Sequence, residues 1–399
     1  MPDLTGSLRR ERVRGHTAEG FAPVADTFAR LMGPGAGGGA LVVRLRGQTV
    51  VDLCAGSADR HGRRPWTPDT LAISFSTTKG VASTVLHRLA DRGVLQYDDA
   101  VATHWPEFAA GGKQRLTIRD LMTHRAGLFS VQAVAERAED LLDHVLMEAR
   151  LAARTVHAPT RRSAYHAITY GWLVSGLLRA ITGRGLAELV ASEVAGPLET
   201  DGLHLGAPAA VQGRVAEPVG RALRHLGAAA QLLRPLWTRS AVPSATLEAL
   251  HVAGFHRLFE GRRPPIWAAE MPAVNGAFSA EGLARLYGTL ANSGSDGGVS
   301  LLSAPRTLEI GRVQVRSSDA VLGLHMRWRL GYHQAFGAGP IAPKAFGHYG
   351  FGGSGGWADP ALGLSVGFVT NRIGSLSTPL GDLTLFRLNR VVRECAAAA

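Results

Sequence analysis

The chain has 399 residues, of which 43 are basic and 32 acidic, giving a net charge of +11, and 46% of its residues are hydrophobic. A globular chain of this length buries a core without staples, and its two distant cysteines exclude a disulfide framework or a cysteine-rich zinc module. The arginines are dispersed without a nucleic-acid-binding signature, no apolar run approaches the ~20 residues of a membrane span, and the N-terminus lacks the apolar core of a secretory signal, so we expect a cytoplasmic protein with no nucleic-acid partner.

The first third of the chain predicts a helix, a hairpin and a second helix. Apolar residues recur at helical spacing over 18–32, and Gly33 and Pro34 then stop the pattern. Two β-rich runs over 39–53 are separated by Arg46-Gly47-Gln48, which is typical of a hairpin. From Ser76 to about Leu95 the spacing is helical again.

The rest of the chain divides into a helical middle and a β-rich end. Residues 96–305 are rich in alanine, leucine and arginine, and the clearest helical patterns cover 134–151, 170–181 and 280–290. The expected elements after them are strands over 323–332, 346–349, 355–358 and 363–370 and a final helix over 379–392.

This order of elements predicts an α+β fold. We expect residues 1–75 and 310–399 to form an antiparallel sheet flanked by helices, with residues 76–309 inserted as a mainly helical domain. The stretch 210–265 is apolar and studded with arginine. It is interpreted either as a surface insertion with its own helices or as a lid over an apolar pocket.

Two motifs match by their residue types but lack the required context, and a third motif is absent. Gly33–Gly38 fits a dinucleotide fingerprint, yet it precedes a strand and opens no helix. Gly352–Gly356 fits a nucleophile elbow around Ser354, but that motif needs a downstream histidine and the last histidine is His348. No HExxH pair occurs among the 15 histidines, so we predict no metal site.

Ser76-Thr77-Thr78-Lys79 is the candidate catalytic motif. Residues i and i+3 share a helix face, so the Lys79 amine can reach the Ser76 hydroxyl. Lysine can act as a base where burial lowers its pKa, whereas arginine does not deprotonate. Lysine occurs only at Lys79, Lys113 and Lys344, against 40 arginines, which makes its use here informative. Alone, the pattern also fits a solvated helix start.

Further segments follow the Ser-x-x-Lys motif in a characteristic order. They are Leu121–Leu128, Tyr165–Trp172, Phe346–Ser354 and a strand ending at Val369–Arg372. Together these segments resemble the serine β-lactamase and penicillin-binding-protein superfamily, and most of all its class C-like branch, which includes the family VIII carboxylesterases. The similarity covers about Leu41 to Asn371. It implies a β-lactamase/transpeptidase-like fold.

The resemblance implies a role for each matching residue. Ser76 is the expected acylated nucleophile, Lys79 its activating partner, and Tyr165 the tyrosine of the Tyr-x-Asn motif that acts as general base with the lysine. His348, Tyr349 and Gly350 occupy the place of Lys-Thr-Gly and are expected to bind substrate. The backbone N–H groups of Ser76 and Phe351 are expected to form the oxyanion hole. Tyr170, a second tyrosine, and Met122–His124 are expected to be structural.

Two departures from the family pattern shape the functional prediction. Ala167 replaces the Asn that recognises substrate amides, and His348 replaces the Lys that contacts a substrate carboxylate. A neutral imidazole offers less charge to such a carboxylate. Both changes favour uncharged esters over antibiotics and cell-wall peptides. We therefore predict a carboxylesterase that cleaves short or medium acyl esters through a Ser76 acyl-enzyme.

The sequence is also compatible with other functions. The same acyl-enzyme could be intercepted by an alcohol or amine, giving an acyltransferase of natural-product biosynthesis. β-Lactamase or D-aminopeptidase activity and a non-catalytic binding role are further alternatives, the last disfavoured by the intact Ser76, Lys79 and Tyr165. The expected partner is a small-molecule ester or acyl donor, with no cofactor. Oligomeric state is not predicted.

Overall fold

The structure is a computed structural model that describes residues 13–33, 35–156, 162–220, 241–261, 263–337, 342–374 and 382–399. The strands are β1 (Val13–Thr17), β2 (Gly38–Leu45), β3 (Gln48–Gly56), β4 (Ala72–Ile73), β5 (Leu203–Leu205), β6 (Gly276–Phe278), β7 (Ser295–Asp296), β8 (Val299–Ser300), β9 (Val315–Ser318), β10 (His325–Trp328), β11 (His333–Gln334), β12 (Phe346–Tyr349), β13 (Gly355–Asp359) and β14 (Leu364–Thr370). The α-helices are α2 (Ala22–Leu31), α3 (Thr77–Asp91), α4 (Val101–His104), α5 (Ile118–Met122), α6 (His144–Ala153), α7 (Thr169–Thr182), α8 (Leu186–Val190), α10 (Ala241–Leu250), α11 (Ala280–Ala291), α12 (Ala304–Ile310) and α13 (Thr384–Ala398). Shorter helical turns are η1 (Pro106–Gly112), η2 (Ala138–Leu142), η3 (Ala191–Ala195), η4 (Ala209–Arg214), η5 (Phe255–Phe259) and η6 (Pro265–Trp267).

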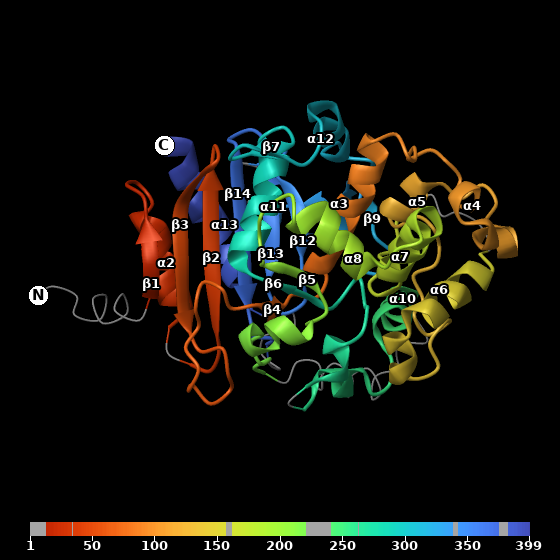
Figure 1. The fold of residues 1–399 in the computed structure, drawn as a ribbon, viewed down its shortest axis with the longest axis horizontal. Coiled ribbons are helices and arrows are strands. Elements are labelled where there is room, and N and C mark those ends of the chain that lie inside the picture. Colours follow the sequence, from red (N-terminus) through yellow and green to blue (C-terminus); the bar gives the residue numbers. More distant parts are fainter. Residues whose placement is uncertain are drawn as a thin grey trace, which may run out of the picture.

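The main sheet has nine strands in the order β1-β3-β2-β14-β13-β12-β11-β10-β9, and each neighbouring pair is antiparallel. All of its strands come from the two ends of the chain, which meet where β14 pairs with β2 (Figure 1). The predicted α+β fold with an antiparallel sheet is confirmed. The hairpin expected over 39–53 is β2 and β3, which turn between Leu45 and Gln48.

Helices cover both faces of this sheet. α2 and α13 pack together on one face, and α11 crosses β14, β2 and β13 on the other (Figure 1). Strand β14 is buried along its whole length, because its side chains meet helices on both sides. α11 lies in the segment 76–309 that was expected to form a separate helical domain, yet it packs on the sheet. The division into two domains stays a prediction.

Helices α4, α5, α6 and α7 lie beyond the sheet edge that carries β9, at the right of the view (Figure 1). α3 links the two regions, because it contacts β12 of the sheet as well as α7 and α8. Its side chains from Thr77 to Leu86 are all buried. A helix buried on every side is fixed in place, and this fixes whatever side chains its first turn carries. Within the described ranges no helix is both long and apolar enough to span a membrane.

The strand predicted over 323–332 was too long. β10 ends at Trp328, and the chain reverses through a tight turn in which Arg329 N–H donates to Tyr332 O at 2.8 Å. Gly331 sits in that turn with φ +75°, a left-handed conformation that glycine adopts without strain. A short second strand, β11, follows at His333. Strand β1 was not predicted, because its sequence, Val-Arg-Gly-His-Thr, is mostly polar and shows no apolar alternation. It pairs with β3 at the sheet edge.

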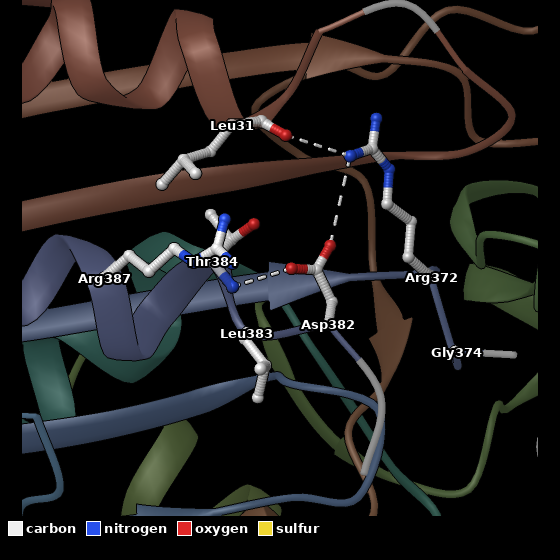
Figure 2. A pocket seen from close by; sticks show the side chains of 7 residues that line it. All are labelled: Leu31, Arg372, Gly374, Asp382, Leu383, Thr384 and Arg387. Atoms are coloured by element: carbon white, nitrogen blue, oxygen red, sulfur yellow. Dashed lines mark hydrogen bonds and ion pairs between the residues drawn. The ribbon is translucent and has the colours of Figure 1, made fainter. Parts of the chain in front are cut away.

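The final helix begins later and ends later than predicted. Residues 379–381 of the expected range lie outside the described residues, and α13 runs from Thr384 to Ala398. Figure 2 shows a pocket of about 260 Å³ at its start, where Asp382 accepts a hydrogen bond from Thr384 N–H at 2.7 Å and faces Arg372 at 4.0 Å. Arg372 in turn donates to Leu31 O at the end of α2. These contacts join β14, α2 and α13 and serve the fold.

Candidate active site

Ser76 stands at the start of α3, after the short strand β4. The residue before it, Phe75, has φ +46°, a strained left-handed conformation for a side chain of this size. The turn is held from both sides, because Ser74 N–H donates to Gly276 O at 2.8 Å and the Thr77 hydroxyl donates to Ser354 O at 3.0 Å. Ser76 is half-buried. This strained turn therefore positions the Ser76 hydroxyl.

Lys79 lies one helical turn on, as the Ser-x-x-Lys spacing predicted, and is fully buried. Its Nζ is 2.9 Å from Ser76 Oγ. The same nitrogen donates to Ala167 O at 2.7 Å and to Ala273 O at 3.2 Å. Burial holds the pKa of Lys79 well below its ordinary value, and no acidic side chain among the described residues opposes that shift. The neutral amine is therefore favoured.

Tyr165 contacts both catalytic candidates. Its ring centroid is 5.1 Å from Lys79 Nζ. Burial raises the pKa of the Tyr165 phenol, and the interaction with the Ser76 side chain opposes this only in part. The ring stacks on Trp328 at 5.5 Å and 11°. Tyr165 is thus held as a neutral phenol beside the Ser76–Lys79 pair.

His348 is buried next to these groups, with its ring 6.4 Å from that of Tyr165. Burial, and then the neighbouring His333 and Lys79, hold the pKa of His348 well below its ordinary value. Its Nδ1 lies 3.1 Å from Tyr349 O, and its Nε2 has no hydrogen-bond partner among the described residues. A positive charge of the kind that the family's lysine carries is thus disfavoured at this position.

The predicted oxyanion donors come from the nucleophile turn and from a second turn that packs against it. Phe351 belongs to the turn between β12 and β13, and its ring meets Phe75 edge-on at 5.6 Å. Neither Ser76 N–H nor Phe351 N–H has a hydrogen-bond partner within the described residues, so both are available to a substrate oxygen. Gly350 allows the close approach, because a Cβ there would lie 2.1 Å from Ser74 O.

Tyr349 does not point to Ser76, in contrast to the substrate-binding role expected of it. Strand β12 directs successive side chains to opposite faces, so Tyr349 lies on the face that α13 covers. Its hydroxyl donates to Phe336 O at 3.1 Å and accepts from Asn389 Nδ2 at 2.8 Å. Only its backbone remains near the site.

Tyr170 and Met122–His124, which were expected to be structural, lie in the core and contact other buried side chains. The Tyr170 hydroxyl is 2.7 Å from Ser83 Oγ and also contacts Met122. His124 Nδ1 accepts from His166 N–H at 3.2 Å. Ser354 is buried and accepts from Thr370 N–H at 3.1 Å, as expected for a turn serine that is not a nucleophile.

Several residues that contact the site were not predicted from the sequence. Ala167 and Ala273 act through carbonyl oxygens, which leave no trace in side-chain motifs. Trp328 stacks on Tyr165 from a strand far along the chain, and Phe259 stacks on Phe75 at 5.4 Å. Phe259 belongs to the 210–265 stretch, which therefore contacts the nucleophile turn. Residues 221–240 and 262 of that stretch lie outside the described residues. Within the described ranges there is no side-chain cluster of metal-ligating type.

Comparisons with known proteins identify the family of this chain. The model of the Beta-lactamase family matches residues 24–385. The chain is 42% identical over 394 residues to the esterase/beta-lactamase LipL of Mycobacterium tuberculosis, covering 97% of this chain and 90% of that protein. The crystal structure of a family VIII carboxylesterase superposes with a TM-score of 0.84 at 33% identity, over 96% of this chain and 99% of that one.

A penicillin-binding protein homologue from Caulobacter crescentus superposes with a TM-score of 0.82 at 30% identity, over 96% of this chain and 99% of that one. Both structures and the family model span nearly the whole chain, including every segment on which the resemblance was based. The chain therefore belongs to the beta-lactamase family and is a serine hydrolase of that superfamily.

Proposed function

We propose that this protein is a carboxylesterase that works through an acyl-enzyme on Ser76, with Lys79 as the base. The observation that carries this proposal is the set of three contacts around Lys79 Nζ. A neutral amine has two N–H groups and one lone pair. With the two N–H groups donated to Ala167 O and Ala273 O, the lone pair faces the Ser76 hydroxyl and can accept its proton.

The reaction then runs in two balanced halves. Ser76 Oγ attacks the ester carbonyl carbon while its proton passes to Lys79 Nζ, and the carbonyl oxygen takes the negative charge between Ser76 N–H and Phe351 N–H. The tetrahedral species expels the alkoxide, which takes the proton from Lys79 and leaves as the alcohol. Water then attacks the acyl-enzyme, gives a proton to the same amine, and releases the carboxylic acid as Ser76 recovers its hydrogen.

We propose a part for Tyr165 that differs from the one expected from the sequence. The sequence suggested that the tyrosine and the lysine share the role of base. Burial raises the phenol pKa and lowers the lysine pKa, and both shifts favour Lys79 as the group that accepts the proton. We assign Tyr165 as a neutral hydrogen-bonding group that donates to Ser76 oxygen or to the leaving oxygen and so guides the proton transfer.

The surroundings favour an uncharged substrate with an apolar acyl group. His348 is held neutral where the family's lysine would meet a carboxylate. Phe75, Phe259 and Phe351 form an aromatic group beside the nucleophile turn. A pocket of about 620 Å³ is also lined by Phe259 and Trp267, but its other lining includes Arg60, Arg64 and Arg263, so we do not assign it to the acyl group. The names of LipL and of the family VIII carboxylesterase support ester hydrolysis as the activity.

The test is a p-nitrophenyl ester series from acetate to laurate, with wild type and Ser76→Ala, and a chromogenic cephalosporin alongside. Ester turnover that disappears in Ser76→Ala, with little cephalosporin cleavage, is the expected result. Activity retained by Ser76→Ala would overturn the proposal. A stoichiometric burst followed by little turnover would keep the acyl-enzyme but redirect it to an alcohol or amine acceptor, making the protein an acyltransferase.

A further inference from the structure

Asp319 lies in the loop between β9 and β10 and is 1% exposed. Its Oδ1 accepts hydrogen bonds from Tyr165 N–H at 3.0 Å, Val321 N–H at 3.0 Å and Leu322 N–H at 3.1 Å. Its Oδ2 accepts from the indole N–H of Trp328 at 3.2 Å. One buried carboxylate thus accepts hydrogen bonds from its own loop, from Tyr165 and from Trp328 of β10.

Two of these four hydrogen bonds help to fix the position of Tyr165. The bond to Tyr165 N–H holds its main chain, and the bond to Trp328 holds the indole whose plane lies 11° from the Tyr165 ring. The ring of a tyrosine can turn and slide even where its backbone is fixed. Asp319 restrains both parts through one side chain.

No salt bridge to Asp319 is found in the part of the chain that the structure describes. A buried carboxylate without a counter-ion is costly, and here its lone pairs are satisfied by N–H donors alone. An asparagine would have suited the loop turn, but its amide would put an NH2 group against one of the N–H donors. The site therefore requires two acceptor oxygens.

We propose that Asp319 is a positioning residue for catalysis, which aligns the Tyr165 hydroxyl with Ser76 through the Tyr165 backbone and the Trp328 indole. The proposal rests on the proposed function, because it assumes that Tyr165 guides the proton transfer at Ser76. Asp319 itself touches no reacting atom. It acts on the rate of acylation and leaves substrate binding largely as it is.

The first variant is Asp319→Asn, which keeps the shape and loses one acceptor. The expected result is an acylation rate for p-nitrophenyl butyrate lowered about 10–100-fold, with KM within about two-fold, since small misplacements of a catalytic group have effects of this size. The matched control is Asp359→Asn. Asp359 is an equally buried carboxylate at the end of β13, bonded to Ala361 N–H and to Arg393. It should lower Tm while leaving the acylation rate unchanged.

A second variant separates positioning from folding. Trp328→Phe keeps an aromatic ring against Tyr165 but removes the indole N–H, so we expect a folded protein with a smaller loss of acylation rate. In this background Asp319→Asn should cost clearly less than in wild type, because one of the two routes to Tyr165 is already broken. Equal costs in both backgrounds, or a Trp328→Phe variant at the wild-type rate, would overturn the role of the indole.

The outcomes distinguish this inference from the proposed function. If Ser76→Ala is inactive while folded Asp319→Asn acylates like wild type, the positioning role is wrong and the acyl-enzyme mechanism stands. If Ser76→Ala keeps its activity, the proposed function itself fails. If Asp319→Asn raises KM and leaves the acylation rate unchanged, the residue shapes substrate binding and the proposal is overturned.

Discussion

Lys79 Nζ lies 2.9 Å from Ser76 Oγ while two backbone carbonyls, at Ala167 and Ala273, take up its other contacts. The Ala167 carbonyl comes from the segment in which the family's asparagine side chain is missing. A main-chain oxygen near Tyr165 therefore orients the amine in this chain. Because main-chain oxygens accept hydrogen bonds but carry no full charge, they direct the lone pair without stabilising the protonated lysine as a carboxylate would.

Replacing Lys79 with arginine tests the need for a neutral amine. Arginine keeps N–H donors but stays positively charged and cannot accept the Ser76 proton, so kcat/KM for p-nitrophenyl butyrate should fall by roughly 10²–10⁴-fold. Lys113→Arg is the matched control, because Lys113 also donates to two backbone carbonyls, at Ala110 and Arg154. Its activity should stay at the wild-type level. A Lys79→Arg variant with near-normal kcat/KM would contradict the assignment of the base.

The pH dependence of acylation follows from the lowered pKa of Lys79. The protonated amine has no lone pair, so activity is present above the pKa of the folded protein and is lost as pH falls through it. Because burial places this pKa well below the ~10.4 of a free lysine, the rate should already be at its plateau in mildly alkaline solution. Stopped-flow acylation rates across pH would show this. A rate that continues to climb towards the pKa of a free lysine would contradict it.

Gly350→Ala tests the close packing behind the oxyanion hole. The added Cβ would meet Ser74 O at 2.1 Å and Thr77 Oγ1 at 3.0 Å, so the β12–β13 turn must move away from Ser76. We expect kcat to fall about 10²–10³-fold, the usual cost of losing one oxyanion donor. Gly213→Ala is the control, since a Cβ there meets nothing within 4 Å. Equal kcat for both variants would argue against the Phe351 donor.

Phe259→Ala tests the contact between the 210–265 stretch and the nucleophile turn. The lost ring removes apolar surface beside Phe75, so kcat/KM should fall more for butyrate and longer esters than for acetate. Phe386→Ala, at the start of α13 and stacked on Phe336, is the control and should leave the chain-length profile unchanged. A profile that also stays unchanged in Phe259→Ala would place the acyl group elsewhere.

The buried histidines predict a loss of stability in mild acid. Burial lowers the pKa of His333 and of His166 to about 4, from an ordinary 6.5. Between these values the unfolded chain binds more protons than the folded one. The free energy of unfolding therefore falls as pH drops from about 6.5 to 4, and these two histidines contribute no further loss below that.

Urea unfolding at several pH values measures this slope. His333→Gln should flatten it, whereas a change at the exposed His61 to glutamine should not. If the slope of His333→Gln equals that of wild type between pH 6.5 and 4, the histidine is not the source of the acid sensitivity.

The sequence predicted the elements whose signal is local. The β2–β3 hairpin, α7 and α11, and strands β12 to β14 lie within a few residues of their expected ranges, because apolar periodicity and glycine turns define them. The strand expected over 323–332 is in fact β10, a turn at Gly331 and β11, and only the tertiary pairing with β9 and β12 reveals this. Strand β1 was missed because an edge strand carries no buried face to mark it.

The residues of the site also fall into two groups, those that local sequence motifs reveal and those that only tertiary contacts reveal. Ser76, Lys79 and Tyr165 were found because the family motifs preserve their spacing, and the structure brings all three together. Tyr349 was expected in the site, but the alternation of side chains along β12 sends it to the opposite face. The carbonyl of Ala273, the indole of Trp328 and the carboxylate of Asp319 act through contacts between segments far apart in the chain. A local sequence pattern does not indicate such long-range contacts.

The central claim, a covalent acyl-enzyme on Ser76 formed by neutral Lys79, is tested most directly by acid-quenching the protein with p-nitrophenyl acetate and locating the adduct by peptide mass spectrometry. The account predicts one acetyl group on the peptide that carries Ser76, formed rapidly in wild type, slowly in Lys79→Arg and not at all in Ser76→Ala. Steady turnover with no adduct on Ser76, or an acetyl group on another residue that persists in Ser76→Ala, would contradict it.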